Sequence, residues 1–274
     1  MNTVGETKAD LEIFLCEDQA EPRVFRLPYG TAVVFTTPRN GAEAPNQDAA
    51  AIIPYSDSET LLVVADGMGG TRNGAKAAAA VVNHLVESAP ENGDDVHTRT
   101  AILDGIEAAN THILAEIPDG GTTLAVVEIR DALVRPYHIG DSSILVTGQR
   151  GKLKFNTIAH SPVGFAVEAG FLDEDEALYH RSRHLISNAV GLAGMRIELG
   201  APLRLAPNDT LLLASDGLTD NLFLNEIIEV ARKGPLDQVV ASLAKLARIR
   251  MVSPKGEHPA KPDYLTIVAY RRSR

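Results

Sequence analysis

Apolar residues along the chain occur in two arrangements, short uninterrupted runs and longer segments with helical spacing. Short apolar runs bounded by turn residues predict buried strands. These predicted strands cover residues 31–36, 60–65, 122–130, 132–139, 142–147, 196–205, 209–214 and 265–270. Helical spacing predicts helices over residues 73–88, 98–117 and 236–251, and another helix that begins at Leu224.

The two long helices before residue 120 show the clearest helical features. Asn73 is a plausible N-cap for the first, because its side chain can accept a hydrogen bond from a free backbone N–H. In the second, Ile102, Ile106 and Ile113 fall on one face. Further along, Asp173 predicts the N-cap of a helix within residues 161–191.

The order of the elements predicts an α+β fold in one domain. Strands come in runs and helices in pairs, which favours segregated layers over alternating βαβ units. Short connections between the strands at 122–130, 132–139 and 142–147 favour antiparallel pairing. We find no internal repeat, low-complexity tract or linker, and therefore assign residues 1–274 to a single domain. The pattern is weakest over residues 1–25.

Composition narrows the classes of function. The chain has 274 residues and is 45% hydrophobic, enough for a sizeable core. Its net charge of −10, from 36 acids against 26 bases, argues against nucleic-acid binding through a basic surface. We see no secretory signal and no apolar run long enough for a membrane span, so a cytoplasmic protein is expected. Cys16, the single cysteine, has no partner for an internal disulfide and is expected to be buried.

Two copies of one pattern point to chemistry at strand ends. The run Leu-Leu-Val-Val-Ala ends on Asp66, and Gly67, Gly69 and Gly70 follow within four positions; a second apolar run ends on Asp216 and a glycine. A charge at the end of a core strand is costly unless something pairs with it. Glycine lets the backbone turn sharply beside a ligand. Carboxylates together with backbone oxygens suit a hard divalent cation.

Three more aspartates lie at strand ends or turns, namely Asp48, Asp141 and Asp263. One aspartate at a turn is ordinary, because aspartate is a common turn residue. The set of five offers oxygen ligands, which suit Mg²⁺ or Mn²⁺. The sequence has no cysteine cluster or close histidine pair that would indicate zinc.

Six segments together resemble the metal-dependent PPM-type phosphatases, the protein phosphatase 2C family. They are Asn46–Asp48, Val64–Gly70, Gly121–Leu124, His138–Ser142, Ala214–Gly217 and Asp263–Thr266, in the order in which the family has them. The Asp-Gly-Met-Gly-Gly block is the most specific of them. The resemblance implies a four-layer αββα sandwich, with two antiparallel β-sheets flanked by helix pairs and a metal site at one edge.

The resemblance also implies an activity. It indicates a Mn²⁺- or Mg²⁺-dependent protein serine/threonine phosphatase in which a metal-activated water attacks phosphoserine or phosphothreonine. The partner would be a phosphorylated protein, and the enzyme would oppose a serine/threonine kinase. Two alternatives stay open. One is a catalytically weak pseudophosphatase that serves as a binding or regulatory module, and the other is a hydrolase of small phosphomonoesters.

Residue by residue, the resemblance assigns the five aspartates and one glycine to metal ions. Asp66 would bridge two ions, and the carbonyl of Gly67 would help to bind the second. Asp216 and Asp263 would complete the shell of the first ion, so that with Asp66 they act in catalysis through the activated water. Asp48 lies in the motif that supports the second ion. Asp141 matches the acid that, with Asp216, holds a third ion in some members.

The chain departs from the family pattern at two positions. Gln47 stands where many members have glutamate, so one charge is lost. Glu43 stands where the family usually has the arginine that grips the substrate phosphate. Arg39, nine residues before Asp48, could return to the site or remain a solvated loop residue. Arg72, after the glycine block, is the other candidate for a guanidinium–phosphate contact.

Histidines and a basic cluster in the second half of the chain have alternative interpretations. His160 could protonate the leaving group or be a plain loop histidine, whereas His138, within a strand, is expected to be structural. The basic cluster comprises His180, Arg181, Arg183 and His184. It could meet a phosphopeptide or pair with the acids that precede it in the segment 161–191.

Overall fold

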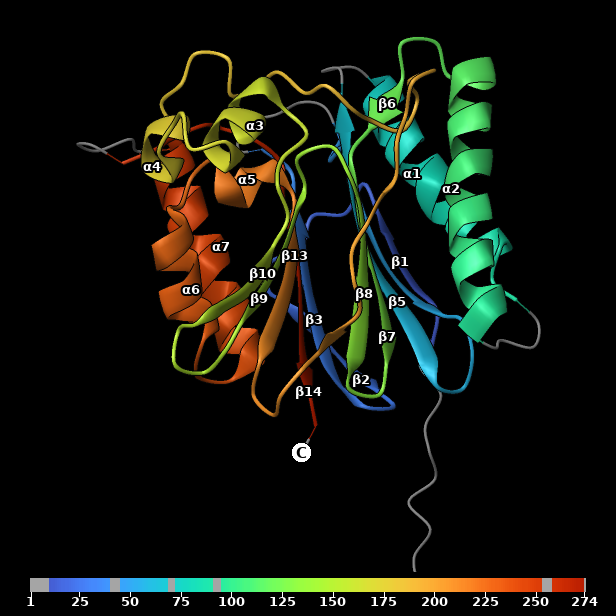
Figure 1. Ribbon diagram of the computed structural model, residues 1–274, viewed down its shortest axis with the longest axis horizontal. Helices are drawn as coiled ribbons and strands as arrows, with labels where there is room; N and C mark the ends of the chain where they lie inside the picture. The colour runs from blue at the N-terminus through green and yellow to red at the C-terminus, as the bar shows by residue number, and fades with distance from the viewer. Residues whose placement is uncertain (1–9, 40–44, 69–71, 91–94, 253–257, 274) are drawn as a thin grey trace, which may run out of the picture.

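A computed structural model describes residues 10–39, 45–68, 72–90, 95–252 and 258–273 of the chain. Two antiparallel sheets pack face to face between two groups of helices (Figure 1). Helices α1 (Arg72–Glu87) and α2 (Asp95–Glu116) lie outside one sheet. Helices α6 (Leu224–Ala231) and α7 (Leu236–Val252) lie outside the other, together with the short α5 (Asp216–Thr219). The predicted four-layer sandwich is confirmed.

Each sheet joins strands from distant parts of the chain. The first runs in the order β1 (Glu12–Leu15), β4 (Asp48–Pro54), β5 (Glu59–Met68), β7 (Leu124–Arg130), β8 (Leu133–Ile139) and β11 (Glu198–Leu199), while β6 (Gly121–Thr122) pairs with β5 and β12 (Leu203–Arg204) with β8. The second runs in the order β10 (Leu153–Asn156), β9 (Ser143–Thr147), β13 (Thr210–Ala214), β14 (Leu265–Arg272), β3 (Gly30–Thr37) and β2 (Arg23–Leu27). Central strands are therefore covered on both faces.

Burial on both faces explains why the central strands are uninterrupted apolar runs. In β5, Leu61 and Val63 pack under α1 and α2, whereas Leu62 and Val64 pack against the second sheet. Alternate side chains of a strand point to opposite faces, so a strand between two apolar layers needs apolar residues at every position. Three apolar layers result, one between the sheets and one under each helix group.

Several details differ from the sequence-based expectations. Helix α1 already begins at Arg72, so Asn73 is not its N-cap; the Asn73 amide donates to the carbonyl of Pro118, 2.9 Å away, and fastens α1 to the loop after α2. Strands β1, β2, β4 and β10 were not among the predicted strands. Cys16 is exposed rather than buried, because β1 ends at Leu15 and the chain turns at Cys16 with φ +55°.

The connection after β8 is the most consequential difference. Strands β7 and β8 pair antiparallel as expected, but β8 and β9 do not pair although only residues 140–142 separate them. The chain crosses there from the first sheet to the second, and this crossing carries Asp141. The two sheets pack against each other through apolar faces, so their strand ends lie close together. A short connection can therefore join one sheet to the other without forming a hairpin.

Two short helices, α3 (Pro162–Glu168) and α4 (Glu174–Ala177), lie at the end of the sandwich above α5 in the view of Figure 1. As predicted, Asp173 caps α4, and its carboxylate accepts a hydrogen bond from the N–H of Asp175 at 2.9 Å. Within the basic cluster, Arg183 donates to the carbonyls of Leu178 and Ala260. It thus binds backbone oxygens instead of the preceding acids and ties this segment to the chain before β14.

The glycine after each strand-end aspartate allows a close backbone approach. A Cβ on Gly67 would overlap the backbone of Gly74 in α1, and a Cβ on Gly217 would overlap the carbonyl of Tyr264. Any side chain at these positions would push the neighbouring segment away. The glycines thus place α1 beside the end of β5 and the start of β14 beside α5. No helix within the described ranges is long and apolar enough to cross a membrane.

We expect Gly217→Ala to destabilise the fold by about 3 kcal/mol, because the added methyl group must displace the backbone at Tyr264. Urea unfolding in chelator measures the change without any contribution from metal binding. Gly194→Ala is the matched control: nothing lies within 4 Å of the added Cβ, and its unfolding free energy should stay within about 0.5 kcal/mol of wild type. Equal stabilities of the two variants would contradict this account.

Candidate metal centre

All five predicted aspartates meet at one edge of the sandwich. Asp48 and Asp66 lie directly opposite each other across the β4–β5 pair. Asp141 lies in the crossing between β8 and β9, Asp216 begins α5 after β13, and Asp263 precedes β14. Asp66 lies at the centre, since the charges of the other four all act on its carboxylate. Both sheets therefore contribute acids to one cluster.

A polar network joins the two sheets beneath these acids. Asn46 donates to the hydroxyl of Thr36 at 2.7 Å, and that hydroxyl lies 2.8 Å from the hydroxyl of Thr266. Ser215 accepts from the backbone N–H of Thr266 at 3.0 Å and donates to Asp48 Oδ2 at 2.8 Å. All five side chains are buried. Buried networks with satisfied partners hold their members in one geometry, so Asp48 is fixed relative to the second sheet.

Burial and mutual repulsion make the ionised cluster costly. Burial, followed by the charges of Asp216 and Asp263, raises the pKa of Asp48 to about 7. Burial and the charges of Asp216 and Asp220 raise the pKa of Asp141 to about 8. The pKa of Asp66 is raised well above its usual value for the same two reasons. Carboxylates in this state are stabilised by a nearby cation.

The donor set fits hard divalent cations. Asp48 Oδ1 is buried and has no hydrogen-bond partner within the described residues, so it is available as a ligand. The five acids offer oxygen only, which Mg²⁺ and Mn²⁺ prefer over softer metals. Gly67, the remaining predicted ligand, follows Asp66 directly in β5, whereas Gly69 and Gly70 lie outside the described residues.

Sequence reasoning missed two charged members of the cluster, Asp220 and Lys261. The ammonium of Lys261 lies 2.5 Å from Asp216 Oδ2, 2.9 Å from Asp220 Oδ2 and 3.0 Å from Asp263 Oδ2. Two spacings could have revealed them. Asp220 comes four residues after Asp216, so a helical turn places both on one face, and Lys261 comes two residues before Asp263, so an extended segment does the same.

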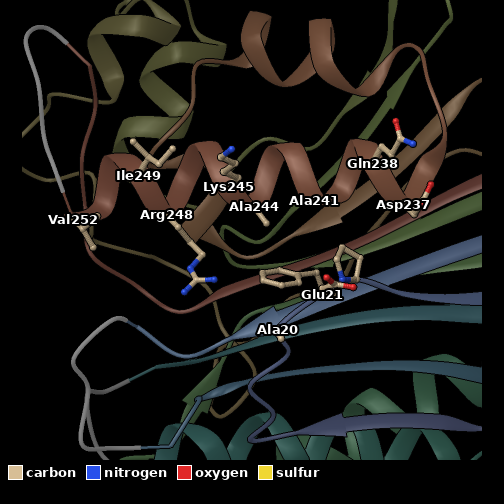
Figure 2. A pocket seen from close by; sticks show the side chains of 12 residues that line it. Ala20, Glu21, Asp237, Gln238, Ala241, Ala244, Lys245, Arg248, Ile249 and Val252 are labelled. Carbon is tan, nitrogen blue, oxygen red and sulfur yellow. The ribbon is translucent and has the colours of Figure 1, made fainter.

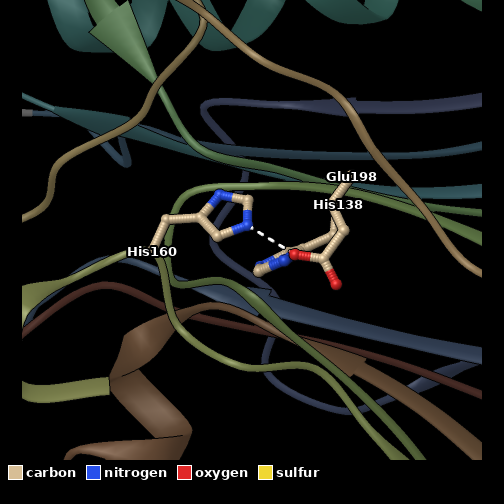
Figure 3. A group of neighbouring side chains, drawn as sticks. All are labelled: His138, His160 and Glu198. Carbon is tan, nitrogen blue, oxygen red and sulfur yellow. Dashed lines mark hydrogen bonds and ion pairs between the residues drawn. The ribbon is translucent and has the colours of Figure 1, made fainter. Parts of the chain in front are cut away.

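His160 supports the turn that carries Asp141. Its Nδ1 accepts from the N–H of Gly140 at 3.1 Å and from the Asn188 amide at 2.9 Å. The proton of the ring is therefore on Nε2, which donates to Glu198 Oε2 at 2.8 Å (Figure 3). His138, also in Figure 3, is buried beside it, and burial and the neighbouring His160 lower the pKa of His138 to about 3. His138 was expected to be structural, and the contacts of His160 make it more than a plain loop histidine, since they fasten the backbone of Gly140.

Arg39 is exposed and lies near the edge of the cluster. Its positive charge acts on the hydroxyl of Tyr264, the residue after Asp263, and the same hydroxyl interacts with Gln47. This places Arg39 on the side of the acids, although within the described residues it forms no hydrogen bond or ion pair with them. Glu43 lies outside the described residues, and so does the side chain of Arg72.

A cavity of about 380 Å³ adjoins the acids. Asp141, Asp216 and Asp220 line one side, and residues of α3 and α4 line the other. The segment 161–191 therefore lies beside the site. A larger groove of about 530 Å³ lies between α7 and residues 20–22 (Figure 2). It contains none of the five predicted aspartates and is separate from the site.

Comparison with known proteins agrees with this geometry. The sequence profile described as Protein phosphatase 2C matches residues 38–250, more than half of the chain. The chain belongs to the protein phosphatase 2C family. With the five acids assembled as described, it is a metal-dependent serine/threonine protein phosphatase of that family.

Bacterial phosphatases are among the relatives of this chain. Protein phosphatase PhpP of Streptococcus pneumoniae serotype 2 is 31% identical over 212 residues, which cover 74% of this chain and 85% of PhpP. The solved serine/threonine phosphatase of S. agalactiae superposes with a TM-score of 0.77 at 29% identity, covering 89% of this chain and all of that one. The PstP catalytic domain, solved with two manganese ions, superposes with a TM-score of 0.70 at 24% identity, covering 90% of this chain and 99% of that one.

We expect Mn²⁺ to bind this phosphatase more tightly as the pH rises from about 6 to about 8, by about tenfold per pH unit for each proton displaced. The reason is that Asp48 and Asp141, with pKa values of about 7 and about 8, hold protons that an arriving cation must displace. Calorimetric titration at several pH values measures the affinity. An affinity that does not depend on pH would contradict the raised pKa values.

Thermal unfolding in chelator is the control and should show the opposite trend. The pKa of a carboxyl such as that of Asp48 is higher in the folded protein than in the unfolded chain. Its contribution to the free energy of unfolding is complete below the pKa of the unfolded chain and is lost as the pH rises through the pKa of the folded protein. The metal-free protein should therefore become less stable over the same pH range.

Proposed function

We propose that this phosphatase removes phosphate from phosphoserine and phosphothreonine in proteins, using two Mn²⁺ or Mg²⁺ ions held by the carboxylate cluster. The observation that carries the proposal is the convergence of five aspartates from both sheets around Asp66. The two manganese ions in the structure of PstP support the number and kind of ions.

Asp66 is proposed to bridge both ions, because it lies at the centre of the five acids. Asp216 and Asp263 would complete the ligands of the first ion, and Asp48 with the carbonyl of Gly67 would serve the second. Asp48 Oδ1 would be the oxygen available to an ion, since Ser215 already donates to Oδ2.

When bound, the ions supply a water that is activated at neutral pH and positive charge that offsets the charge of the phosphate. The residues of the chain do the positioning. Ser215 holds Asp48 in one orientation, and His160 holds the backbone of Gly140, next to Asp141. Arg39 is proposed to grip the substrate phosphate, because its charge lies on the side of Tyr264 near the cluster. The cavity between α3, α4 and the acids is where the phosphorylated peptide is proposed to lie.

The partner is proposed to be a phosphorylated protein, and the enzyme is proposed to oppose a serine/threonine kinase. Relatives named as protein phosphatases, such as PhpP, support a protein substrate over a small phosphomonoester. The intact set of five acids argues against a pseudophosphatase that only binds partners. Hydrolysis of a phosphothreonine peptide and of an aryl phosphate, each with Mn²⁺, Mg²⁺ or chelator, tests all three alternatives together.

Asp66→Asn should lower kcat/KM for a phosphothreonine peptide by at least about 100- to 1,000-fold, because the central charge that holds the ions is lost. The fold should survive, since this charge serves the ions rather than the apolar core. Steady-state kinetics and circular dichroism measure the two effects. Asp104→Asn, at an exposed position of α2, is the control and should behave like wild type. Undiminished turnover in Asp66→Asn, or in chelator, would refute the proposed mechanism.

Arg39→Ala should raise KM about ten- to a hundredfold if the guanidinium grips phosphate, since a charge-assisted pair of hydrogen bonds is lost. The affinity for Mn²⁺ should barely change, because arginine is not a metal ligand. Arg72→Ala tests the other candidate, and Arg26→Ala, at an exposed position of β2, is the control. If KM stays at the wild-type value in both Arg39→Ala and Arg72→Ala, an arginine clamp from either position is excluded.

A further inference from the structure

Lys261 places a positive charge inside the carboxylate cluster. Its ammonium contacts one oxygen each of Asp216, Asp220 and Asp263, all within 3.0 Å. Burial disfavours the charged lysine, but the three carboxylates outweigh burial and raise the pKa of Lys261 well above its usual value. The side chain is about a quarter exposed, and the three carboxylates are less exposed still. Lys261 is therefore a fixed counter-ion for three acids.

The backbone around Lys261 is clamped, so the position of the ammonium is built into the fold. The N–H of Lys261 donates to Asn221 Oδ1 at 2.8 Å, and the carbonyl of Lys261 accepts from Asn221 Nδ2 at 2.9 Å. Asn221 is fully buried, and the same Nδ2 donates to the carbonyl of Gly217 in α5. On the other side, Arg183 donates to the carbonyl of Ala260. These contacts fix the backbone of Lys261 beside the cluster, and the three carboxylates hold its ammonium there.

The ammonium of Lys261 lies where a third divalent ion would bind, so the two would compete for the same carboxylates. Asp141 and Lys261 share the same two neighbours, since the charges of Asp216 and Asp220 act on both. Lys261 already engages Oδ2 of both acids, the oxygens nearest to it. A cation that bound Asp141 together with Asp216 would therefore meet an ammonium beside its ligands, and like charges at this separation repel.

We propose that the Lys261 ammonium is a built-in cation that takes the place of a third divalent ion beside Asp141, Asp216 and Asp220. The inference rests on the two-ion site proposed above. Two exchangeable divalent ions and one covalently attached charge then offset most of the negative charge of the cluster. The part of the cluster next to the cavity keeps its positive charge whatever the concentration of metal in the surroundings.

Lys261→Met tests the inference, because it removes the charge and keeps most of the aliphatic stem. Wild-type protein saturated with Mn²⁺ should retain two ions per chain, and Lys261→Met should retain three, as counted by elemental mass spectrometry after gel filtration. In chelator, Lys261→Met should melt about 5 °C below wild type, since three acids lose their counter-ion. With Mn²⁺ most of this difference should vanish, because the third ion replaces the ammonium.

Two further variants make the test specific. The double variant Lys261→Met/Asp220→Asn removes one negative charge together with the positive one. Its melting temperature in chelator should therefore be higher than that of Lys261→Met, and it should again retain two Mn²⁺ ions per chain. Lys245→Met, at an exposed position of α7, is the control and should match wild type in both measurements. If Lys261→Met cannot be purified in chelator, the ion count of protein purified in Mn²⁺ decides alone.

Equal ion counts in wild type and Lys261→Met would overturn the role of Lys261 and leave the proposed function intact. A melting temperature in chelator that is unchanged by Lys261→Met would also overturn it, since no counter-ion would then have been lost. Wild-type protein that retains no Mn²⁺ and hydrolyses no phosphopeptide would instead overturn the proposed function itself. The two failures therefore have different signatures.

Discussion

Repulsion among like charges at one edge of the sandwich is the constraint on which the rest of the structure depends. Asp48, Asp66, Asp141, Asp216 and Asp263 lie where burial weakens hydration, and burial and mutual repulsion together raise their pKa values. Such a cluster cannot be both ionised and stable without cations. The same repulsion favours metal binding. A divalent ion binds most strongly where carboxylate ligands are held in place and their negative charges are not yet neutralised.

The fold keeps the acids together by attaching them to rigid elements. Asp48 and Asp66 are cross-strand partners in one sheet, whereas Asp216 and Asp263 flank strands of the other. The hydrogen bond from Ser215 to Asp48 spans the two sheets, so neither can slide without breaking a buried contact. Carboxylates that repel one another are thus held by apolar layers on either side, whose burial supplies the opposing free energy.

Positive charge reaches the cluster from more than one source. Divalent ions are exchangeable, whereas Lys261 is attached to the chain and clamped by Asn221. Arg183 links the residue before Lys261 to the segment that carries α3 and α4. The segment beside the cavity is therefore mechanically connected to a residue that contacts two proposed metal ligands.

Much of the fold could be predicted from local pattern, because the responsible forces act locally. Uninterrupted apolar runs predicted most central strands, since strands covered on both faces are largely apolar, although the central strand β4 was missed. Helical spacing predicted α2 and α7 for a similar reason, through the apolar faces that they bury. The weakly patterned edge strands β1, β2 and β10 were missed, because each has exposed positions that interrupt the apolar run.

The sequence by itself determined which residue types are available to the site: the two Asp-Gly pairs, the three other aspartates and their order. Only the tertiary structure decided that the five acids meet, since they come from both sheets and are up to more than 200 positions apart in the chain. It also decided that Asp141 lies on a crossing between sheets, and that Lys261 and Asp220 join the cluster. Electrostatic partnership depends on distance in space, and local spacing indicates that distance only for residues that are close in the chain.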